Sequence, residues 1–376
     1  MKEWLEETNE EGEKLYKTLG WPSLADSPTQ QEYTQSKAFD ANAFGGNGIS
    51  QIVFKNNGEV TAKQLKDFDE KEFELFKEKF GKTIPSNEHK LLALKDWKLQ
   101  NGFLIIIPEN ANAEITIESK AQEGVVGLHN IVVLEKGAKA KIYEKQEGKN
   151  VLQASATEVF LSRESELNFD FTQNLGLESV DFGIKRAELS ENARLVWNTS
   201  FIGGKTSIAT IDSKLLGQGA KAENYNSFFG LKNQVFDVST NSFHFVPNTG
   251  GNLLSKGVLT GESQSTYRGL IYINAKAAKT NCFLNSHTLL LGEKAKANSI
   301  PSLEILANDV QSRHGATVDH LDEEKVFYLM TRGLNRKESE KTIVDGFMGE
   351  VFQKSNGFAL KDWEKLLKER MEIANA

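Results

Sequence analysis

A repeat of about 27 residues constrains the fold of this 376-residue chain more than any other feature. Each copy has an apolar residue, then a polar turn with Gly, Glu or Asn, then small or apolar residues that restart an alternating pattern. The leading apolar residues are 27 or 28 positions apart in the five clearest copies: Ile107–Ala113, Leu134–Ala140, Leu161–Leu167, Leu189–Leu195 and Leu216–Ala222. Fainter copies begin at Val246, Ile273 and Leu291.

A fixed period of strands and turns, without helices between them, is typical of stacked coils. One coil cannot bury its apolar face alone, so neighbouring coils bury it through ladders of paired strands. The repeat therefore predicts a mainly β fold with a β-solenoid core. The alternative is a large β-sandwich whose turns happen to be evenly spaced.

The two ends of the chain have helical patterns, which divide it into three predicted domains. Residues 1–102 form an N-terminal helical and loop domain, residues 103–316 the solenoid, and residues 317–376 a C-terminal helical domain. In the first domain, apolar spacing predicts a helix over Thr61–Phe80 that stops at Gly81. The Ser-, Gln-, Asn- and Gly-rich stretch Pro22–Gly58 is predicted to be loop or extended chain.

In the C-terminal domain, Asp322–Arg332 is predicted to form one helix, and Asn335 with Glu338 resembles a capping box that opens the next. A wide apolar stripe follows over Ile343–Phe352. We expect the helices at both ends to cap the solenoid and to protect its open strand edges.

Composition excludes several classes of function. The chain has 45 Lys and Arg against 52 Asp and Glu, so its net charge of −7 argues against a nucleic-acid partner. Its longest apolar run, Phe103–Ile107, is too short for a membrane span, and its first twenty residues have no signal-peptide core. The single cysteine, Cys282, excludes an internal disulfide. We expect a cytoplasmic protein without membrane contact.

Chemically active motifs are few. Gly203–Thr206 resembles the end of a phosphate-binding loop but lacks the earlier glycine and the following helix, so a turn is expected. Cys282 has apolar neighbours and is expected to be a small buried filler. Five of the six histidines are dispersed and expected to be structural, whereas His314 lies near Asp309 where the solenoid is predicted to give way to helix. A neutral imidazole there can ligate iron or shuttle protons.

The segment around His314 resembles a known family. Asn308–Val310, His314–Val318, Leu321–Glu324, Phe327–Leu329 and Arg332–Gly333 are similar to the C-terminal signature of the SufB/SufD family of iron–sulfur cluster assembly proteins. The resemblance covers roughly residues 85 to 352, and His-Gly-Ala-Thr at His314–Thr317 favours the SufD branch.

This resemblance implies a right-handed parallel β-helix between two helical domains. It also implies a non-enzymatic scaffold whose β-helix pairs with that of a SufB-like paralogue, while its C-terminal helices bind the ATPase SufC. His314 would then be an iron site at the SufB interface, with no tightly bound cofactor and at most a transient iron–sulfur cluster. The expected SufC-docking residues, as anchors of the interface or of the packing beneath it, are Phe327, Tyr328, Arg332, Gly333, Leu334, Phe347 and Met348.

Ser312 departs from the family pattern, because SufD proteins often carry a cysteine two residues before the histidine. A serine hydroxyl is a poor ligand for a soft metal, so we expect no thiolate close to His314. Two other functions stay open. One is a SufB-like scaffold that pairs with itself, and the other is a β-solenoid enzyme acting on polysaccharide. The enzyme would need converging carboxylates, for which Glu109, Glu135, Glu164 and Glu191 are the candidates.

Overall fold

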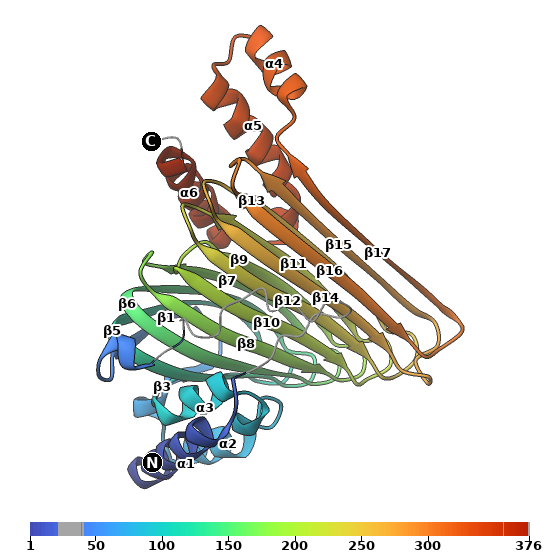
Figure 1. Ribbon diagram of the computed structural model, residues 1–376. Helices are drawn as coiled ribbons and strands as arrows, with labels where there is room; N and C mark the ends of the chain where they lie inside the picture. Colours follow the sequence, from blue (N-terminus) through green and yellow to red (C-terminus); the bar gives the residue numbers. More distant parts are fainter. Residues whose placement is uncertain (22–38, 40, 356, 375–376) are drawn as a thin grey trace.

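The protein is a parallel β-solenoid of about eight turns with helices at both chain ends, as the repeat predicted (Figure 1). The computed structural model describes residues 1–21, 39, 41–355 and 357–374. Within the stretch Pro22–Gly58, predicted to be loop or extended chain, residues 22–38 and 40 lie outside the described residues. The later part of that stretch includes a strand, β1 (Ile49–Asn57).

Each coil contributes a strand to two ladders, which form the two faces of a flattened solenoid. The long strands β5 (Asn112–Leu134) and β6 (Lys139–Leu161) pass through both ladders, and later strands each pair with the strand two positions on. Ladder A continues through β8 (Val180–Leu189), β10 (Thr206–Leu215), β12 (Val235–His244), β14 (Gln264–Ile273) and β16 (Lys296–Ile305). Ladder B continues through β7 (Glu166–Leu175), β9 (Arg194–Phe201), β11 (Lys221–Gly230), β13 (Gly250–Leu259), β15 (Thr280–Leu290) and β17 (Val310–His320).

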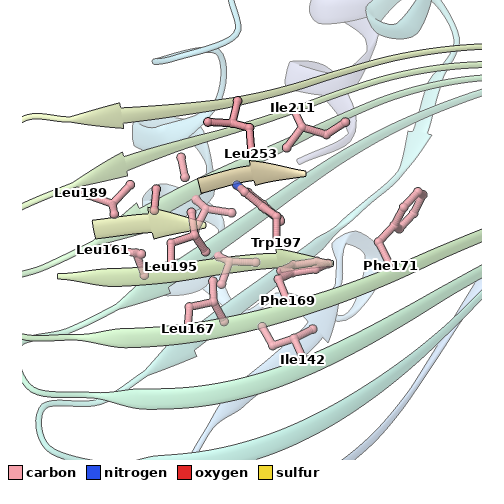
Figure 2. Packing of buried hydrophobic residues seen from close by; sticks show 14 of the residues in the cluster. Ile142, Leu161, Leu167, Phe169, Phe171, Leu189, Leu195, Trp197, Ile211 and Leu253 are labelled. Atoms are coloured by element: carbon pink, nitrogen blue, oxygen red, sulfur yellow. The ribbon is translucent and has the colours of Figure 1, made fainter. Parts of the chain in front are cut away.

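In-register pairing stacks equivalent side chains of successive coils inside the solenoid. Phe169 pairs with Trp197, and Trp197 pairs with Asn224 one coil later. The inward apolar side chains of both ladders form one continuous core, part of which Figure 2 shows around Trp197, Phe169 and Leu195. Burying each large apolar side chain contributes about 1.5–3 kcal/mol, so the stack stabilises every coil that has a neighbour.

The turns explain the composition of the repeat. The third residue after each leading apolar residue has a positive φ: Asn110, Gly137, Glu164, Asn192 and Gly219 lie between 57° and 77°. Gly and Asn tolerate this left-handed conformation best. The glycines are also sterically required, because a Cβ on Gly137 would lie 2.3 Å from Asn110 Oδ1 in the preceding coil. The predicted copy at Leu291 is wrong in register, since it follows β15 of ladder B instead of ending a ladder A strand.

The N-terminal end of the solenoid is closed by antiparallel strands. β1 pairs with β5 of ladder B, and β2 (Thr61–Gln64) pairs with β4 (Phe103–Ile107) of ladder A. The helix predicted over Thr61–Phe80 is therefore wrong in its first half, because pairing with β4 outweighs local periodicity there. A helix does form over α2 (Glu70–Lys79), with an Asp69–Glu72 capping box, and Gly81 follows it in a left-handed conformation.

Of the other N-terminal helices, α3 (Lys90–Trp97) packs on ladder A and α1 (Lys2–Thr18) packs on α3. A buried polar cluster joins α3 and the loop after α2 to the solenoid. Glu158 accepts hydrogen bonds from the backbone of Gly81 and from His129 Nε2, at 2.6 and 2.8 Å. Burial opposes ionisation of Glu158, but the bonds from His129 and Thr83 hold its pKa down at about 2. Lys95 Nζ lies 2.6 Å from the other ring nitrogen of His129, which completes the cluster.

The first C-terminal helix projects away from the solenoid, and the others lie along its flank (Figure 1). These C-terminal elements are α4 (Glu323–Thr331), α5 (Arg336–Gly349), a 3-10 turn (Glu350–Lys354) and α6 (Gly357–Ala374), and the predicted capping box at Asn335 is present. α5 and α6 pack on ladder B, and α6 runs back to β6, where Tyr143 donates a 2.6 Å hydrogen bond to Asp362 (Figure 1). The expectation that these helices cap the solenoid is wrong, because α5 and α6 cover its side and no helix among the described residues covers its last coil.

The packing inside the solenoid leads to a stability prediction. Trp197→Ala should lower the free energy of unfolding by about 3–5 kcal/mol, because Trp197 is fully buried between coils. Val196→Ala, on the outer face of the same strand, should cost much less. Urea unfolding of the two variants measures the difference, and equal losses would contradict the inward orientation of Trp197.

Candidate functional site at the open end of the solenoid

The last coil, formed by β16 and β17, is exposed where earlier coils are buried. β16 pairs with β14, and β17 pairs with β15; within the described part of the chain, neither has a further strand beyond it. Their inward positions continue the buried rows of the core, yet Ile305 and Val318 are 38% and 40% exposed. The solenoid of the described residues therefore ends in two open strand edges (Figure 1), and these two apolar side chains are exposed there.

His314 lies within this open coil. It is in β17, the last strand before the C-terminal helices, six residues before the strand ends and nine before α4 begins. It pairs in register with Leu284, whose side chain is fully buried, and so belongs to an inward-facing row. Its own side chain is exposed, because no later coil covers it.

The described residues include no group of three or more His, Cys, Asp or Glu side chains arranged to hold a metal ion. His314 is therefore an exposed imidazole at an open strand edge.

The single thiol lies closer to His314 than expected. Cys282 pairs directly with Ser312 in the neighbouring strand, so both residues face the same side of ladder B. The coil period at this point of the solenoid is 30 residues, and it pairs Cys282 with Ser312. The repeat in the sequence could therefore have predicted this proximity. Cys282 is fully buried, and burial raises the pKa of its thiol to about 12, so it stays protonated at neutral pH.

The predicted docking residues fall into two groups. Phe327 and Tyr328 on α4 are 67% and 56% exposed, and Arg332 lies over the Tyr328 ring at 5.2 Å. Gly333 ends α4 with a φ of 99°, and the half-buried Leu334 leads into α5. This exposed set, with Met330, is named the α4 patch.

The remaining two residues pack inward. Met348 is 1% exposed and joins the core between α5, α6 and ladder B. Phe347 is half-buried, and Lys256 Nζ lies 4.7 Å from the centre of its ring. These two side chains hold the helices on the solenoid, whereas the α4 patch faces away from it.

A cavity of about 330 Å³ separates the helices from the edge of ladder B. Its lining includes His287, Asp319, His320, Asp322 and Lys325. His287 Nδ1 lies 2.7 Å from Thr317 Oγ1, and burial together with nearby Lys256 lowers the pKa of His287. The cavity thus lies between the open edge and the helices without a preformed metal site.

The candidate carboxylates for a polysaccharide-active enzyme lie on exposed turns, where basic side chains pair with three of them. Arg163 Nε lies 3.2 Å from Glu164 and 3.6 Å from Glu191, and Lys136 lies 3.8 Å from Glu109. These are solvated ion pairs along the stacked turns, and nothing in their arrangement favours glycoside chemistry.

The fold is thus a flattened parallel solenoid with one closed end, one open end and helices at both chain ends. Residues 101–347 match the model of the SufBD core domain of the SUF system for iron–sulfur cluster assembly. The chain belongs to this family.

Curated relatives agree with this assignment. The chain is 26% identical over 289 residues to iron-sulfur cluster assembly SufBD family proteins of Staphylococcus haemolyticus and Staphylococcus epidermidis, covering 75% of this chain and 62% of theirs. It is 26% identical over 319 residues to one of Staphylococcus aureus, covering 81% of this chain and 68% of the relative. The chain thus spans about three-fifths of the length of the first two relatives. Among the described residues, no helix combines the length and apolarity needed to cross a bilayer.

The burial of Cys282 leads to a reactivity prediction. At pH 8 the folded protein should react with a thiol reagent such as DTNB at least about 100-fold more slowly than the urea-unfolded chain, whose thiol has a pKa near 8.5. Absorbance during labelling measures both rates. Comparable rates in the folded and unfolded states would show that the last coils open readily and expose the thiol.

Proposed function

We propose that this chain is a non-catalytic, cytoplasmic scaffold subunit of a SUF complex. It pairs through its open end with a second SufBD-type solenoid, such as a SufB-like paralogue, and binds a SufC-like ATPase through the α4 patch. The single observation that carries this proposal is the open last coil, with two free strand edges and exposed interior side chains.

The shape of the open end favours a partner of the same architecture. Unpaired strand edges are usually shortened, charged or covered, since they otherwise pair with other chains. Here two edges from two packed ladders are open at once, with Ile305 and Val318 exposed between them. A single added strand can pair with only one of these edges. The end of another two-ladder solenoid presents two edges together and can bury the apolar interior as well.

Pairing at this end would also complete the site at His314. The exposed imidazole lies on the last strand, so a partner that covers the coil brings its own side chains beside it. Iron or a nascent cluster would be cargo held between the two chains, which accords with the lack of a three-ligand group among the described residues of this one.

The α4 patch suits a second partner. Phe327, Tyr328 and Met330 are exposed apolar side chains on one short helix, and aromatic residues with a neighbouring arginine are enriched in binding hot spots. The patch belongs to a helix that projects away from the solenoid, and it leaves the open end free. One chain can therefore bind an ATPase and a second solenoid at the same time.

An iron measurement tests the role of His314. His314→Ala should lower the iron content of the anaerobically purified complex with a SufB-like chain at least several-fold, while the complex stays assembled. His287→Ala, on the outward face of the neighbouring strand, should retain iron and serves as the control. Light scattering and iron analysis on the same fractions give both readouts. Unchanged iron in His314→Ala would contradict the assignment.

A pull-down tests the α4 patch. The double change Phe327→Glu and Tyr328→Glu should weaken binding of a SufC-like ATPase by about 100-fold or more, because both apolar contacts are lost and charge is added. Ile373→Glu, at an apolar position on α6 that is 47% exposed, should bind normally. If the double variant retains the ATPase, docking takes place elsewhere.

A further inference from the structure

Six polar side chains lie inside the early coils of the solenoid, where an apolar core is expected. They come from β6, β7 and β8, and each is at least 94% buried. They are Glu144, Gln146, Gln153, Gln173, Asp181 and Lys185. Burying charged side chains is costly unless they are paired, so the partners of these six side chains decide whether the cluster is stable.

Within this interior cluster, Glu144 and Lys185 form an ion pair whose net charge is zero. Lys185 Nζ lies 3.1 Å from Glu144 Oε2, and Gln146 donates a 3.0 Å hydrogen bond to the other Glu144 oxygen. The same ammonium group lies 3.7 Å from the centre of the Phe171 ring and 3.4 Å from Thr157 Oγ1. Its contacts are thus directed to Glu144, the Phe171 ring and a hydroxyl.

Asp181 is left without a cation of its own. Its oxygens receive only two long hydrogen bonds, from the side-chain amides of Gln153 and Gln173, both at 3.4 Å. Among the described residues, no lysine or arginine nitrogen lies within 4.0 Å of this carboxyl group. If all three groups were ionised, the closed interior would carry one uncompensated negative charge.

A small void lies beside the same carboxyl group. Asp181, Lys185, Gly183 and Ala209 help to line a cavity of about 10 Å³, which is close to the space that one water molecule needs. The absence of a side chain at Gly183 contributes to the void. One water there can accept a proton from a carboxylic acid or donate to a carboxylate, so the site has room for proton exchange.

We propose that the interior cluster of Glu144, Lys185 and Asp181 is a proton-binding site, in which Asp181 carries one proton under mildly acidic conditions and makes the solenoid interior electrically neutral. The groups that face Asp181 are Lys185 and Glu144 as charges, and Gln153, Gln173 and Ser207 as polar neighbours. Burial raises the pKa of Asp181 to about 7, although Lys185 and the two amides oppose the shift. The folded chain is therefore more stable with Asp181 protonated than with Asp181 ionised.

The sign of the pH dependence follows from this shift. An unfolded aspartate titrates near 3.9, so between about pH 4 and pH 7 the unfolded chain has released a proton that the folded chain keeps. The unfolding equilibrium constant therefore rises with pH, by up to about tenfold per pH unit from this group, and levels off above about pH 7. A proton bound inside the coils stabilises the solenoid under mildly acidic conditions.

Urea unfolding of the full chain between pH 5 and pH 8 tests the proposal, with Asp181→Asn as the main variant. The ratio of the wild-type unfolding constant to that of Asp181→Asn should rise about tenfold per pH unit between about pH 5 and pH 6.5. Glu144→Gln frees Lys185 to pair with Asp181 and should flatten the wild-type dependence. Glu262→Gln, which changes an exposed ion pair, should keep it. Parallel wild-type and Asp181→Asn curves would overturn the proposal.

Infrared spectroscopy provides a readout that does not depend on unfolding. At pH 6 the folded wild-type protein should show the carbonyl band of a protonated carboxylic acid that is absent from Asp181→Asn. If difference spectra show no such band, Asp181 is ionised in the folded protein and the proposal is wrong, whatever the unfolding curves show.

Discussion

In-register stacking of coils is the constraint on which the rest of this structure depends. Each strand pairs along its length with the strand one coil away, so a residue and its equivalents form a row through the interior. Apolar rows bury each other and make the core continuous. Stacking gives each inner coil two neighbours but gives each end coil only one. The exposed side of an end coil must therefore be covered by another part of the chain or by another molecule.

The two ends of the solenoid differ, because one is closed by strands of the chain and the other is open. The proposed function depends on this difference. Antiparallel β1 and β2 close the first coil. Helices α5 and α6 instead follow the flank of ladder B, anchored by contacts such as that between Tyr143 and Asp362. The last coil stays open with His314 on it, while the α4 patch faces outward elsewhere. Family membership in the SufBD group agrees with a protein whose surfaces serve assembly.

Features encoded locally could be predicted from the sequence, and features that depend on long-range register could not. Turn residues such as Asn110 and Gly137 need a left-handed backbone, so they marked the repeat, and the Asn335 capping box marked α5. The two strands in each coil, the strand at Thr61 and the proximity of Cys282 to Ser312 arise from pairing between distant segments. The sequence did not predict the open end. An apolar stripe on a C-terminal helix indicates that the helix packs against something, but it does not indicate which surface it covers.

The claim that the open end pairs with a second solenoid is tested most directly by light scattering of this chain mixed with a SufB-like paralogue. The wild type should form a one-to-one complex. A variant with Ile305→Asp and Val318→Asp, which charges the exposed interior of the last coil, should stay separate while it still binds the ATPase through the α4 patch. A one-to-one complex of undiminished affinity in this variant would contradict the account and place the interface on another face of the solenoid.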